Sequence, residues 1–240
     1  MSKCKIADVV FDLEPKYAYF GKRLAEFLSD GEETPEYSVV SDDASIERER
    51  KKYSLPENLP APLIEDLFFE RRVSDYILGK KNGTLFHGSA IEYGGGAYVF
   101  TARSGTGKST HAGLWRELLG DRVKMINDDK PIVRIIDGKP VIYGTPWKGK
   151  HGLGGNIKAP VKAICRLVQA KENSIREVSV KEFLPTFFVQ CYHVGEKRKK
   201  ENFLEFLDGL LTGVKLFELK CDISIAAAEL SFTAMTGDKI

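Results

Sequence analysis

Residues 104–110 read Ser-Gly-Thr-Gly-Lys-Ser-Thr, and they follow the apolar run Ala-Tyr-Val-Phe at 97–100. A strand that leads into a glycine-rich turn and then into a helix is the arrangement of a phosphate-binding loop. Glycine tolerates positive φ angles, so successive backbone N–H groups can converge on phosphate oxygens. The N-terminus of the following helix adds partial positive charge. The stretch therefore predicts a site for the phosphates of a nucleotide.

The candidate phosphate-binding residues are Ser104, Gly105, Thr106, Gly107, Lys108, Ser109 and Thr110. Lys108 can reach the β- and γ-phosphates as a compact charge, and the Ser109 hydroxyl can ligate Mg²⁺. In the consensus G-x-x-x-x-G-K-[ST], the first glycine falls at Ala102 in this chain. Alanine cannot adopt the strained backbone angles open to glycine, so we expect the loop to begin differently from that of an ordinary nucleoside triphosphatase.

The composition favours one sizeable core and argues against several classes of partner. The chain has 240 residues, of which 42% are apolar, and its net charge is +2 from 36 basic and 34 acidic residues. Neither a nucleic-acid nor a membrane partner is expected from this balance. The cysteines are widely spaced, with no C-x-x-C pair, and the first twelve residues have too short an apolar stretch for a signal peptide. We therefore expect a cytoplasmic protein.

The patterns along the chain predict an α/β fold with a mixed sheet and much antiparallel pairing, because apparent hairpins flank the phosphate-binding loop on both sides. Strands are expected at 6–11, 36–40, 84–93, 97–101, 123–126, 131–136, 140–143, 161–168, 175–180 and 214–219. Helices are expected at 63–78, 108–119, 181–194, 199–211 and 223–235. The segment 17–28 fits either a strand or a short helix, and the charged runs 45–52 and 196–201 are expected to be solvated.

Three prolines between 56 and 62 suggest a boundary in the chain. We expect residues 1–55 to form a small mixed segment packed on the core, and residues 56–240 to form the nucleotide-binding domain.

Asp128 and Asp129 follow the end of the strand expected at 123–126, and Asp128 lies 20 residues after Lys108. In phosphate-loop enzymes, an acidic residue at a neighbouring strand end helps to hold Mg²⁺. Two adjacent carboxylates can divide the work, since one can support the metal while the other accepts a proton from an attacking hydroxyl. A polar strand end that enters a turn would also explain Asn-Asp-Asp-Lys-Pro.

Other polar residues are candidates for the same site. His87 precedes Gly88 in the strand expected at 84–93, where a lone histidine is more often a core residue than a functional one. The glycine-rich loop 144–156 is long for a connection, and Lys148 or Lys150 could neutralise a transferring phosphoryl group. A surface loop with solvated lysines is the alternative. His111, in the first turn of the helix at 108–119, is expected to pack or cap rather than to act in catalysis.

Taken in order, His87-Gly88, a short hairpin, the loop at 104–110 and Asp128-Asp129 resemble the HPr kinase/phosphorylase family, relatives of the phosphoenolpyruvate carboxykinases. In that family a His-Gly precedes the loop at about this distance and an Asp-Asp pair follows it. The sequences of the loop and of the segment Gly-Thr-Pro-Trp-Lys-Gly at 144–149 are similar to those of an uncharacterised bacterial branch of HPr-kinase-like proteins. The family's HPr-docking loop finds no clear match in this sequence.

The resemblance implies a mixed-sheet P-loop kinase domain of the HPr kinase/PEP carboxykinase-like type, and a homo-oligomer. It implies that Lys108 and the loop amides hold the phosphates of ATP, with Mg²⁺ near Ser109. It further implies that His87, Asp128 and Asp129 surround the attacking hydroxyl. We favour Asp128 as the base and Asp129 as the support for the metal, and the reverse assignment is open.

These observations predict an ATP-dependent phosphotransferase acting on a hydroxyl, with a serine of a protein or peptide, or a small molecule, as the acceptor. The alternative is a module that binds ATP and a partner without catalysis. A GTPase switch is disfavoured, because the chain has no Asn-Lys-x-Asp guanine motif. A carboxykinase proper is disfavoured because the chain is short for that fold's added substrate lobes.

Overall fold

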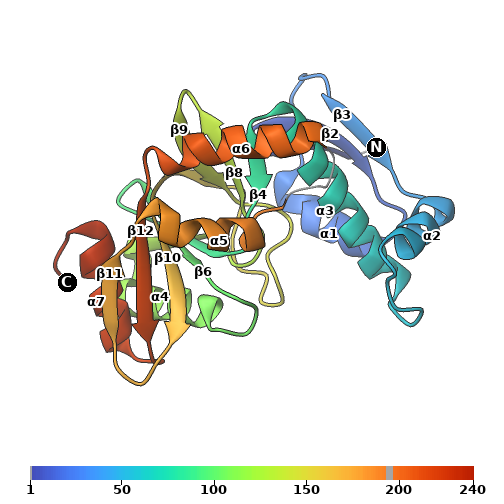
Figure 1. Ribbon diagram of the computed structural model, residues 1–240. Helices are drawn as coiled ribbons and strands as arrows, with labels where there is room; N and C mark the ends of the chain where they lie inside the picture. Colours follow the sequence, from blue (N-terminus) through green and yellow to red (C-terminus); the bar gives the residue numbers. More distant parts are fainter. Residues whose placement is uncertain (1, 193–196) are drawn as a thin grey trace.

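The computed structural model describes residues 2–192 and 197–240, and within them a curled, mixed sheet of nine strands carries the glycine-rich loop 104–110 (Figure 1). The strands are β4 (Gly83–Leu85), β5 (Ser89–Tyr93), β6 (Gly96–Thr101), β7 (Val123–Asn127), β8 (Ile132–Ile136), β9 (Lys139–Tyr143), β10 (Lys158–Gln169), β11 (Ser174–Glu177) and β12 (Lys215–Cys221). Their order is β4-β8-β9-β10-β6-β5-β7, with β12 paired to β10 and β11 paired to β12. The α/β class with several antiparallel hairpins is therefore confirmed.

Strand β10 joins the two halves of this sheet. Its first residues, 158–160, pair antiparallel with β9, whereas residues 163–169 pair parallel with β12 and residues 161–166 pair parallel with β6. Because β6, β10 and β12 run in the same direction, their carboxyl ends meet at one edge of the sheet. In open α/β sheets such an edge is where ligands bind.

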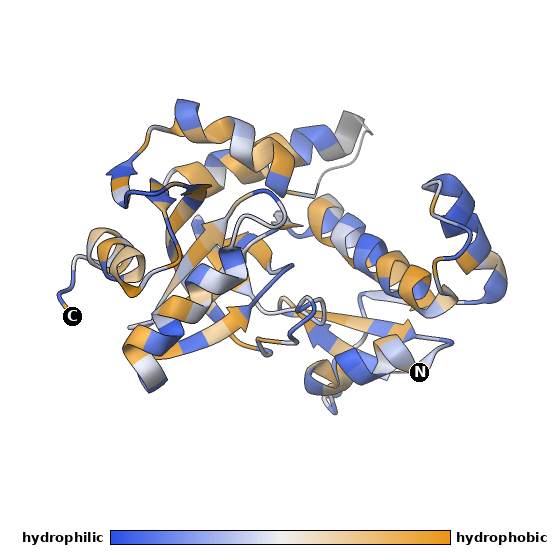
Figure 2. Cartoon of the chain, turned by 90° about the horizontal axis from the view of Figure 1, so that it is seen from below, coloured by the Kyte–Doolittle hydropathy of each residue, from blue (hydrophilic) through white to orange (hydrophobic). Residues whose placement is uncertain are grey.

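Helices cover both faces of this sheet. Helices α4 (Lys108–Leu119) and α7 (Ile225–Thr236) pack on one face, and α5 (Val180–Gln190) and α6 (Lys197–Leu211) pack on the other. Alternate residues of β6 serve the two faces, since Tyr98 and Phe100 join the α4 cluster while Ala97 and Val99 join the α5 cluster. This is the period of two expected for a strand buried on both sides. Figure 2 shows largely hydrophobic strands beside helices of mixed hydropathy.

The N-terminal segment forms a second, three-stranded sheet of β1 (Ser2–Ile6), β2 (Val9–Glu14) and β3 (Tyr37–Val40). Helices α1 (Ala18–Leu24), α2 (Asp43–Lys52) and α3 (Ala61–Lys80) accompany it, and a 3₁₀ turn, η1 (Ala25–Phe27), follows α1. One core cluster unites both parts of the chain, because Phe11 and Phe20 pack with Phe69, Tyr143 and Trp147. The boundary at residue 56 stays a prediction.

Two expected strands are interrupted, which the apolar pattern alone did not indicate. The strand expected at 6–11 is a hairpin, whose turn is formed by Ala7 and Asp8 with φ angles of 52° and 58°. The strand expected at 84–93 is broken between β4 and β5 at residues 86–88, where the His87 N–H donates to the Gln190 carbonyl and the Gly88 N–H donates to the Asp129 carbonyl. This break places His87 outside the regular sheet.

The charged run at 45–52 is helical rather than merely solvated. Asp42 accepts a hydrogen bond from the Ser45 backbone and so caps helix α2. Glu49 of this helix is buried and paired with Arg71 of α3. The expected end of the helix 181–194 and the start of the charged run at Glu196 lie outside the described residues. No helix in 2–192 or 197–240 combines the length and apolar composition that a membrane crossing requires.

His111 is a packed residue of α4, as its position predicted. Its side chain is buried, its ring meets Phe100 edge-on at 4.7 Å between centroids, and its Nε2 lies 2.9 Å from the Ser231 Oγ of α7. Burial lowers the pKa of His111 from 6.5 to about 4. The imidazole is therefore neutral at pH 7. Protonating it in acid is unfavourable, because the charged ring would be buried away from water.

We expect this buried imidazole to weaken the fold between pH 6.5 and pH 4. Since the unfolded chain binds the proton first as the pH falls, the contribution of His111 to the free energy of unfolding should drop by about 2 kcal/mol between pH 7 and pH 5. Urea unfolding at both pH values should show a larger decrease for the wild type than for His111→Gln. Comparing the two proteins cancels the opposite effect of Asp66 and Glu70, whose pKa values are raised by burial. Equal decreases would contradict the assignment.

Candidate active site

The loop between β6 and α4 adopts the conformation that its glycines permit. Gly105 has a φ of +79° and Gly107, which caps α4, has a φ of +116°. A Cβ added at either position would meet no atom within 4 Å, so the need for glycine is in the backbone angle and not in crowding. The Thr106 N–H donates to the Arg103 carbonyl at 3.2 Å and closes the turn.

Ala102 is accommodated without strain. It is buried against the α4 cluster, and it is not among the residues with positive φ. Its carbonyl accepts a hydrogen bond from Lys108 Nζ at 3.3 Å. A glycine is therefore not required at this position, which accounts for the departure from the consensus.

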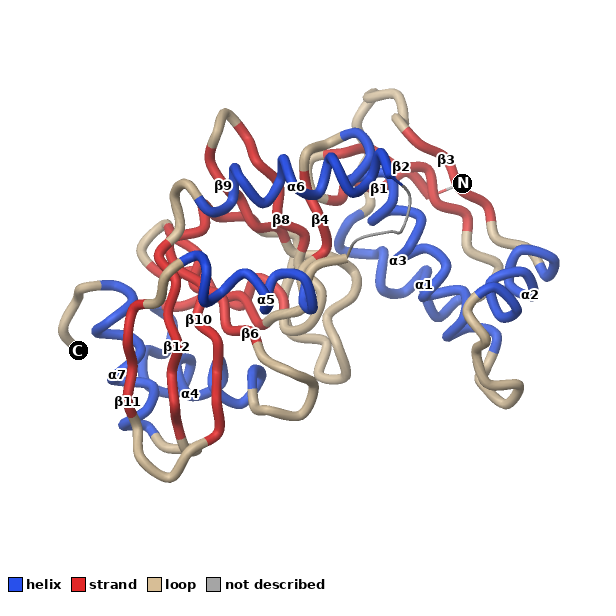
Figure 3. Tube along the Cα trace, viewed as in Figure 1, coloured by secondary structure: helices blue, strands red, loops and turns tan. Residues whose placement is uncertain are grey.

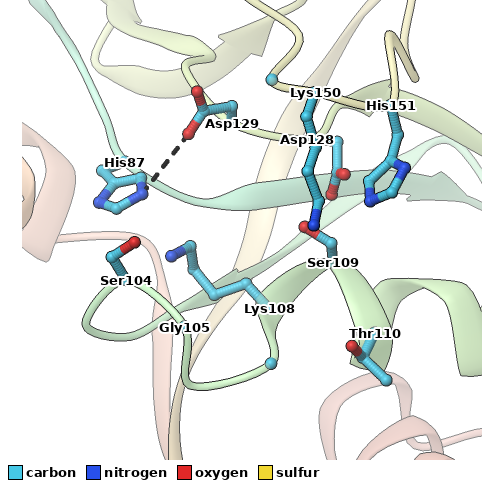
Figure 4. Close-up of a pocket in the computed structure, with 12 residues that line it drawn as sticks. His87, Ser104, Gly105, Lys108, Ser109, Thr110, Asp128, Asp129, Lys150 and His151 are labelled. Atoms are coloured by element: carbon cyan, nitrogen blue, oxygen red, sulfur yellow. Dashed lines mark ion pairs between the residues drawn. The ribbon is translucent and has the colours of Figure 1, made fainter.

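A cavity of about 470 Å³, called here the phosphate pocket, opens above this loop (Figure 4). Its lining residues are His87, Ser104, Gly105, Gly107, Lys108, Ser109, Thr110, Asp128, Asp129, Gly149, Lys150 and His151. The structure thus brings together the loop, the acidic pair, the histidine and part of the loop 144–156. Thr106 alone among the candidate phosphate-binding residues lies outside this lining.

Lys108 lies within this pocket in the first turn of α4. Its side chain is largely buried, and burial is the main reason that its pKa is lowered, with Asp129 acting in the opposite direction. A cation with this little water around it interacts strongly with an anion that enters the pocket.

The two carboxylates occupy different surroundings. Asp128 is 5% exposed, and the Ser89 hydroxyl donates to its Oδ1 at 2.6 Å. The side chain of Asp129 is 33% exposed and lies 3.5 Å from His87 Nε2 and 3.7 Å from Lys130 Nζ. One carboxylate is thus fixed by a hydroxyl, and the other is open to the pocket.

Asn127 holds the turn that presents this acidic pair. Its Oδ1 accepts the backbone N–H groups of Asp129 at 2.9 Å and of Lys130 at 2.8 Å. Its amide nitrogen donates to the Thr145 carbonyl and hydroxyl, both at 3.1 Å. The side chain is fully buried, so this network links the strand end rigidly to the loop that follows β9.

His87 faces the phosphate-binding loop from the break between β4 and β5. Burial, followed by the nearby charges of Lys130 and Lys108, lowers its pKa from 6.5 to about 4, although Asp129 and Gln190 oppose the shift. The ring is therefore neutral at pH 7. It can exchange a hydrogen bond with Asp129 or with a ligand hydroxyl, but it adds no charge to the pocket.

The loop 144–156 lies between the large sheet and helices α1 and α3, as the tan segment after β9 in Figure 3 shows. Lys150 and His151 line the pocket, whereas Lys148 turns to the N-terminal segment and pairs with Glu26 at 2.6 Å. The placement of Lys148 therefore leaves Lys150 as the lysine of this loop at the pocket. Trp147 is buried and stacks on Phe20 at 5.9 Å.

Sequence reasoning missed the supporting residues Ser89, Asn127 and Gly149. Asparagine just before the acidic pair is a recognisable turn signal, because its side chain commonly bonds backbone N–H groups two and three residues on. Gly149 has a φ of +67°, and a Cβ there would lie 3.1 Å from the Asp129 Cβ. Nothing local in the sequence indicates that contact, or the one between Ser89 and Asp128.

The pocket suits Mg²⁺ that arrives with a nucleotide. Within the described ranges, no group of three or more His, Cys, Asp or Glu side chains is placed to hold a metal ion by protein groups alone. Mg²⁺ commonly binds through one or two carboxylates together with substrate phosphates and water. The Ser109 hydroxyl and one carboxylate of the acidic pair fit that requirement.

Comparison with protein-family models gave no match, and comparison with curated proteins gave none either. Among solved structures, the chain is similar to the HPr(Ser) kinase/phosphatase from Coxiella burnetii, at 10% sequence identity and a TM-score of 0.34. The similarity covers 62% of this chain and 95% of that one. At these values the similarity establishes neither a family nor a function for this chain.

Proposed function

We propose that the protein is an ATP-dependent phosphotransferase that transfers the γ-phosphoryl group to a hydroxyl acceptor. The observation that carries the proposal is the shared pocket, where Lys108 and a glycine-rich loop face Asp128, Asp129 and His87. Phosphoryl transfer requires positioning and charge neutralisation more than covalent work by the protein, and this set of groups supplies both. The acceptor that we favour is a serine of a protein or peptide, or a small molecule with a hydroxyl group, as the HPr-kinase-like motifs suggest.

The ligands of the proposal are ATP and Mg²⁺. The amides of 104–110 and the Lys108 ammonium would hold the phosphates, and Ser109 with Asp129 would hold the metal. Bound Mg²⁺ supplies neutralisation of charge on the phosphate oxygens. Lys150 approaches from the opposite side of the pocket, where it can stabilise charge on the transferring group.

Asp128 is our candidate for the general base. Its Oδ1 is fixed by Ser89, so its second oxygen can be held in one orientation toward an acceptor. In the proposed step the acceptor oxygen bonds to the γ-phosphorus, the bond from that phosphorus to the β,γ-bridging oxygen breaks, and ADP leaves. The acceptor proton passes to the carboxylate of Asp128. Neutral His87 can hydrogen-bond the acceptor without repelling Lys108.

Replacing Lys108 tests the nucleotide site directly. Lys108→Met should weaken the binding of Mg-ATP by about 10- to 100-fold, because a largely buried charge that can hydrogen-bond the phosphates is lost. Titration calorimetry with ATP and with tripolyphosphate measures this. Lys124→Met is the matched control, since Lys124 is an exposed lysine of β7. Equal affinities in the wild type and Lys108→Met would contradict the proposed site.

The rival function is a module that binds ATP and a partner without catalysis. It predicts the same calorimetric result but no ADP formation from ATP, with water or with any hydroxyl compound as acceptor. ADP formation that depends on Asp128 therefore separates the two functions. A homo-oligomer in the cytoplasm is part of the proposal and is tested by light scattering and by cell fractionation.

A further inference from the structure

A second cavity of about 330 Å³, called here the edge cavity, lies at the carboxyl ends of β10 and β12. Its lining residues are Thr106, Gly107, Thr110, His111, Leu114, Leu167, Gln169, Ala170, Cys221, Asp222 and Ile223. Gly107 and Thr110 also line the phosphate pocket, so the two cavities adjoin across the first turn of α4. A molecule whose phosphates bind to the loop can therefore extend directly from the phosphate pocket into the edge cavity.

The walls of the edge cavity are mainly apolar. Leu114 projects from α4, Leu167 and Ala170 come from the end of β10, and Ile223 follows β12. Ile223 is 77% exposed, which leaves a large apolar side chain at the rim without a cover. A flat, apolar ligand surface would remove it from water.

Among the polar side chains of the lining, Gln169 and Asp222 are both held in place by hydrogen bonds. Gln169 Nε2 donates to the Thr106 carbonyl at 3.2 Å and so ties the end of β10 to the phosphate-binding loop. Asp222 Oδ1 accepts from Asn173 Nδ2 at 3.0 Å and from Ser224 Oγ at 2.5 Å. A cavity with apolar walls and a few fixed polar groups is the usual form of a small-molecule site.

A third cavity is the competing location. It measures about 460 Å³ between the phosphate-binding loop, β10 and α5, and its lining includes Arg103, Arg166 and Val189. It shares no lining residue with the phosphate pocket. Arg166 there is already paired with Glu218, and Arg103 suits an anion better than an uncharged ring system. Continuity and chemistry both favour the edge cavity for the uncharged end of a nucleotide.

We propose that the edge cavity binds the ribose and base of the nucleoside triphosphate whose phosphates occupy the loop 104–110. This subsite rests on the proposed function, because it assumes that the loop holds the phosphates. The ribose lies over Thr110, and the base lies between Leu114 and Ile223. The affinity for a nucleotide then exceeds the affinity for its phosphate chain alone.

The test compares Mg-ATP with Mg-tripolyphosphate, which has the phosphates but no nucleoside. Ile223→Ser should weaken ATP binding about fivefold to tenfold, since it removes apolar contact with the base, and should leave tripolyphosphate binding unchanged. Val189→Ser is the matched control, because Val189 is 72% exposed and lines the third cavity. It should alter neither affinity.

An added tryptophan supplies a spectroscopic readout. Both natural tryptophans, Trp115 and Trp147, are buried, so the exposed indole of an Ile223→Trp variant would dominate the response to a ligand at the rim. Its fluorescence should change when ATP binds and stay constant when tripolyphosphate binds.

Each outcome bears on one of the two proposals. Weaker ATP binding by Val189→Ser but not by Ile223→Ser would overturn the edge cavity as the nucleoside subsite. So would equal affinities of the wild type for ATP and tripolyphosphate. Failure of the wild type to bind tripolyphosphate at all would overturn the phosphate site itself, and with it the proposed function.

Discussion

Asp128→Asn is expected to lower the rate of phosphoryl transfer by about 10³-fold, a loss typical of removing a general base. Asparagine has nearly the same shape, and its Oδ1 can still accept the hydrogen bond from Ser89, so the turn should remain intact. It cannot take up the acceptor proton. The affinity for Mg-ATP should therefore change by no more than about threefold.

The measurement uses water as the probe acceptor and follows ADP formed from Mg-ATP in a single turnover, with calorimetry for affinity. Asp121→Asn, at an exposed acidic residue after α4, is the control for a change in net charge.

Asp129→Asn should act differently, by raising the Mg²⁺ concentration that transfer requires. Undiminished turnover by Asp128→Asn would reject Asp128 as the base, and a Mg²⁺ effect in that variant instead would reverse the two assignments.

Gly144→Ala should destabilise the protein by about 4 kcal/mol or more, the range reserved for changes that the backbone cannot absorb. A Cβ at this position would lie 1.7 Å from the Gly155 carbonyl oxygen and 2.8 Å from that of Ile126. Both are backbone atoms, so relief requires the strand end and the loop to move apart. Around this contact Gly155 N–H donates to Ile126 O at 3.2 Å, and Asp128 N–H donates to Leu153 O at 3.2 Å.

Urea unfolding measures this loss, and Gly113→Ala is the matched control. Gly113 lies inside α4, and a Cβ there would meet nothing within 4 Å. Alanine in a helix interior should raise the free energy of unfolding by about 0.5–1 kcal/mol. A Gly144→Ala protein as stable as the wild type would show that the loop 144–156 does not press against the end of β7.

The features that sequence reasoning predicted are those whose chemistry is local. The glycine-rich turn at 104–107 and helix α4 were predicted at their observed positions, because the residues of a phosphate-binding motif are consecutive in the sequence. The hairpin of β8 and β9 was found through Asp137-Gly138, where Asp137 has a φ of +49°. The proximity of Asp128 to the loop followed from strand ends meeting at one edge. The roles of these residues stay predictions.

The features that were missed depend on contacts between distant segments. Ser89 bonds Asp128 across 39 residues, and Lys148 pairs with Glu26 across 122 residues. The local sequence around a lysine in a glycine-rich loop does not indicate whether its side chain faces a phosphate or a buried aromatic cluster. The hairpin at Ala7 was missed because its turn contains no glycine and Asp8, a residue that tolerates the left-handed region, stands alone within an apolar run.

The attachment of the loop 144–156 to the N-terminal segment has a consequence for how such a protein can vary. Trp147 stacks on Phe20, and Lys148 pairs with Glu26. The loop 144–156, which lies against the acidic pair, is therefore supported by residues more than a hundred positions earlier in the chain. Exchanging residues 1–55 with those of another protein would therefore also alter the pocket in which we propose that phosphoryl transfer takes place. Under the proposed function, changes in α1 and η1 would alter the acceptor preference while Lys108 and the loop 104–110 stay the same.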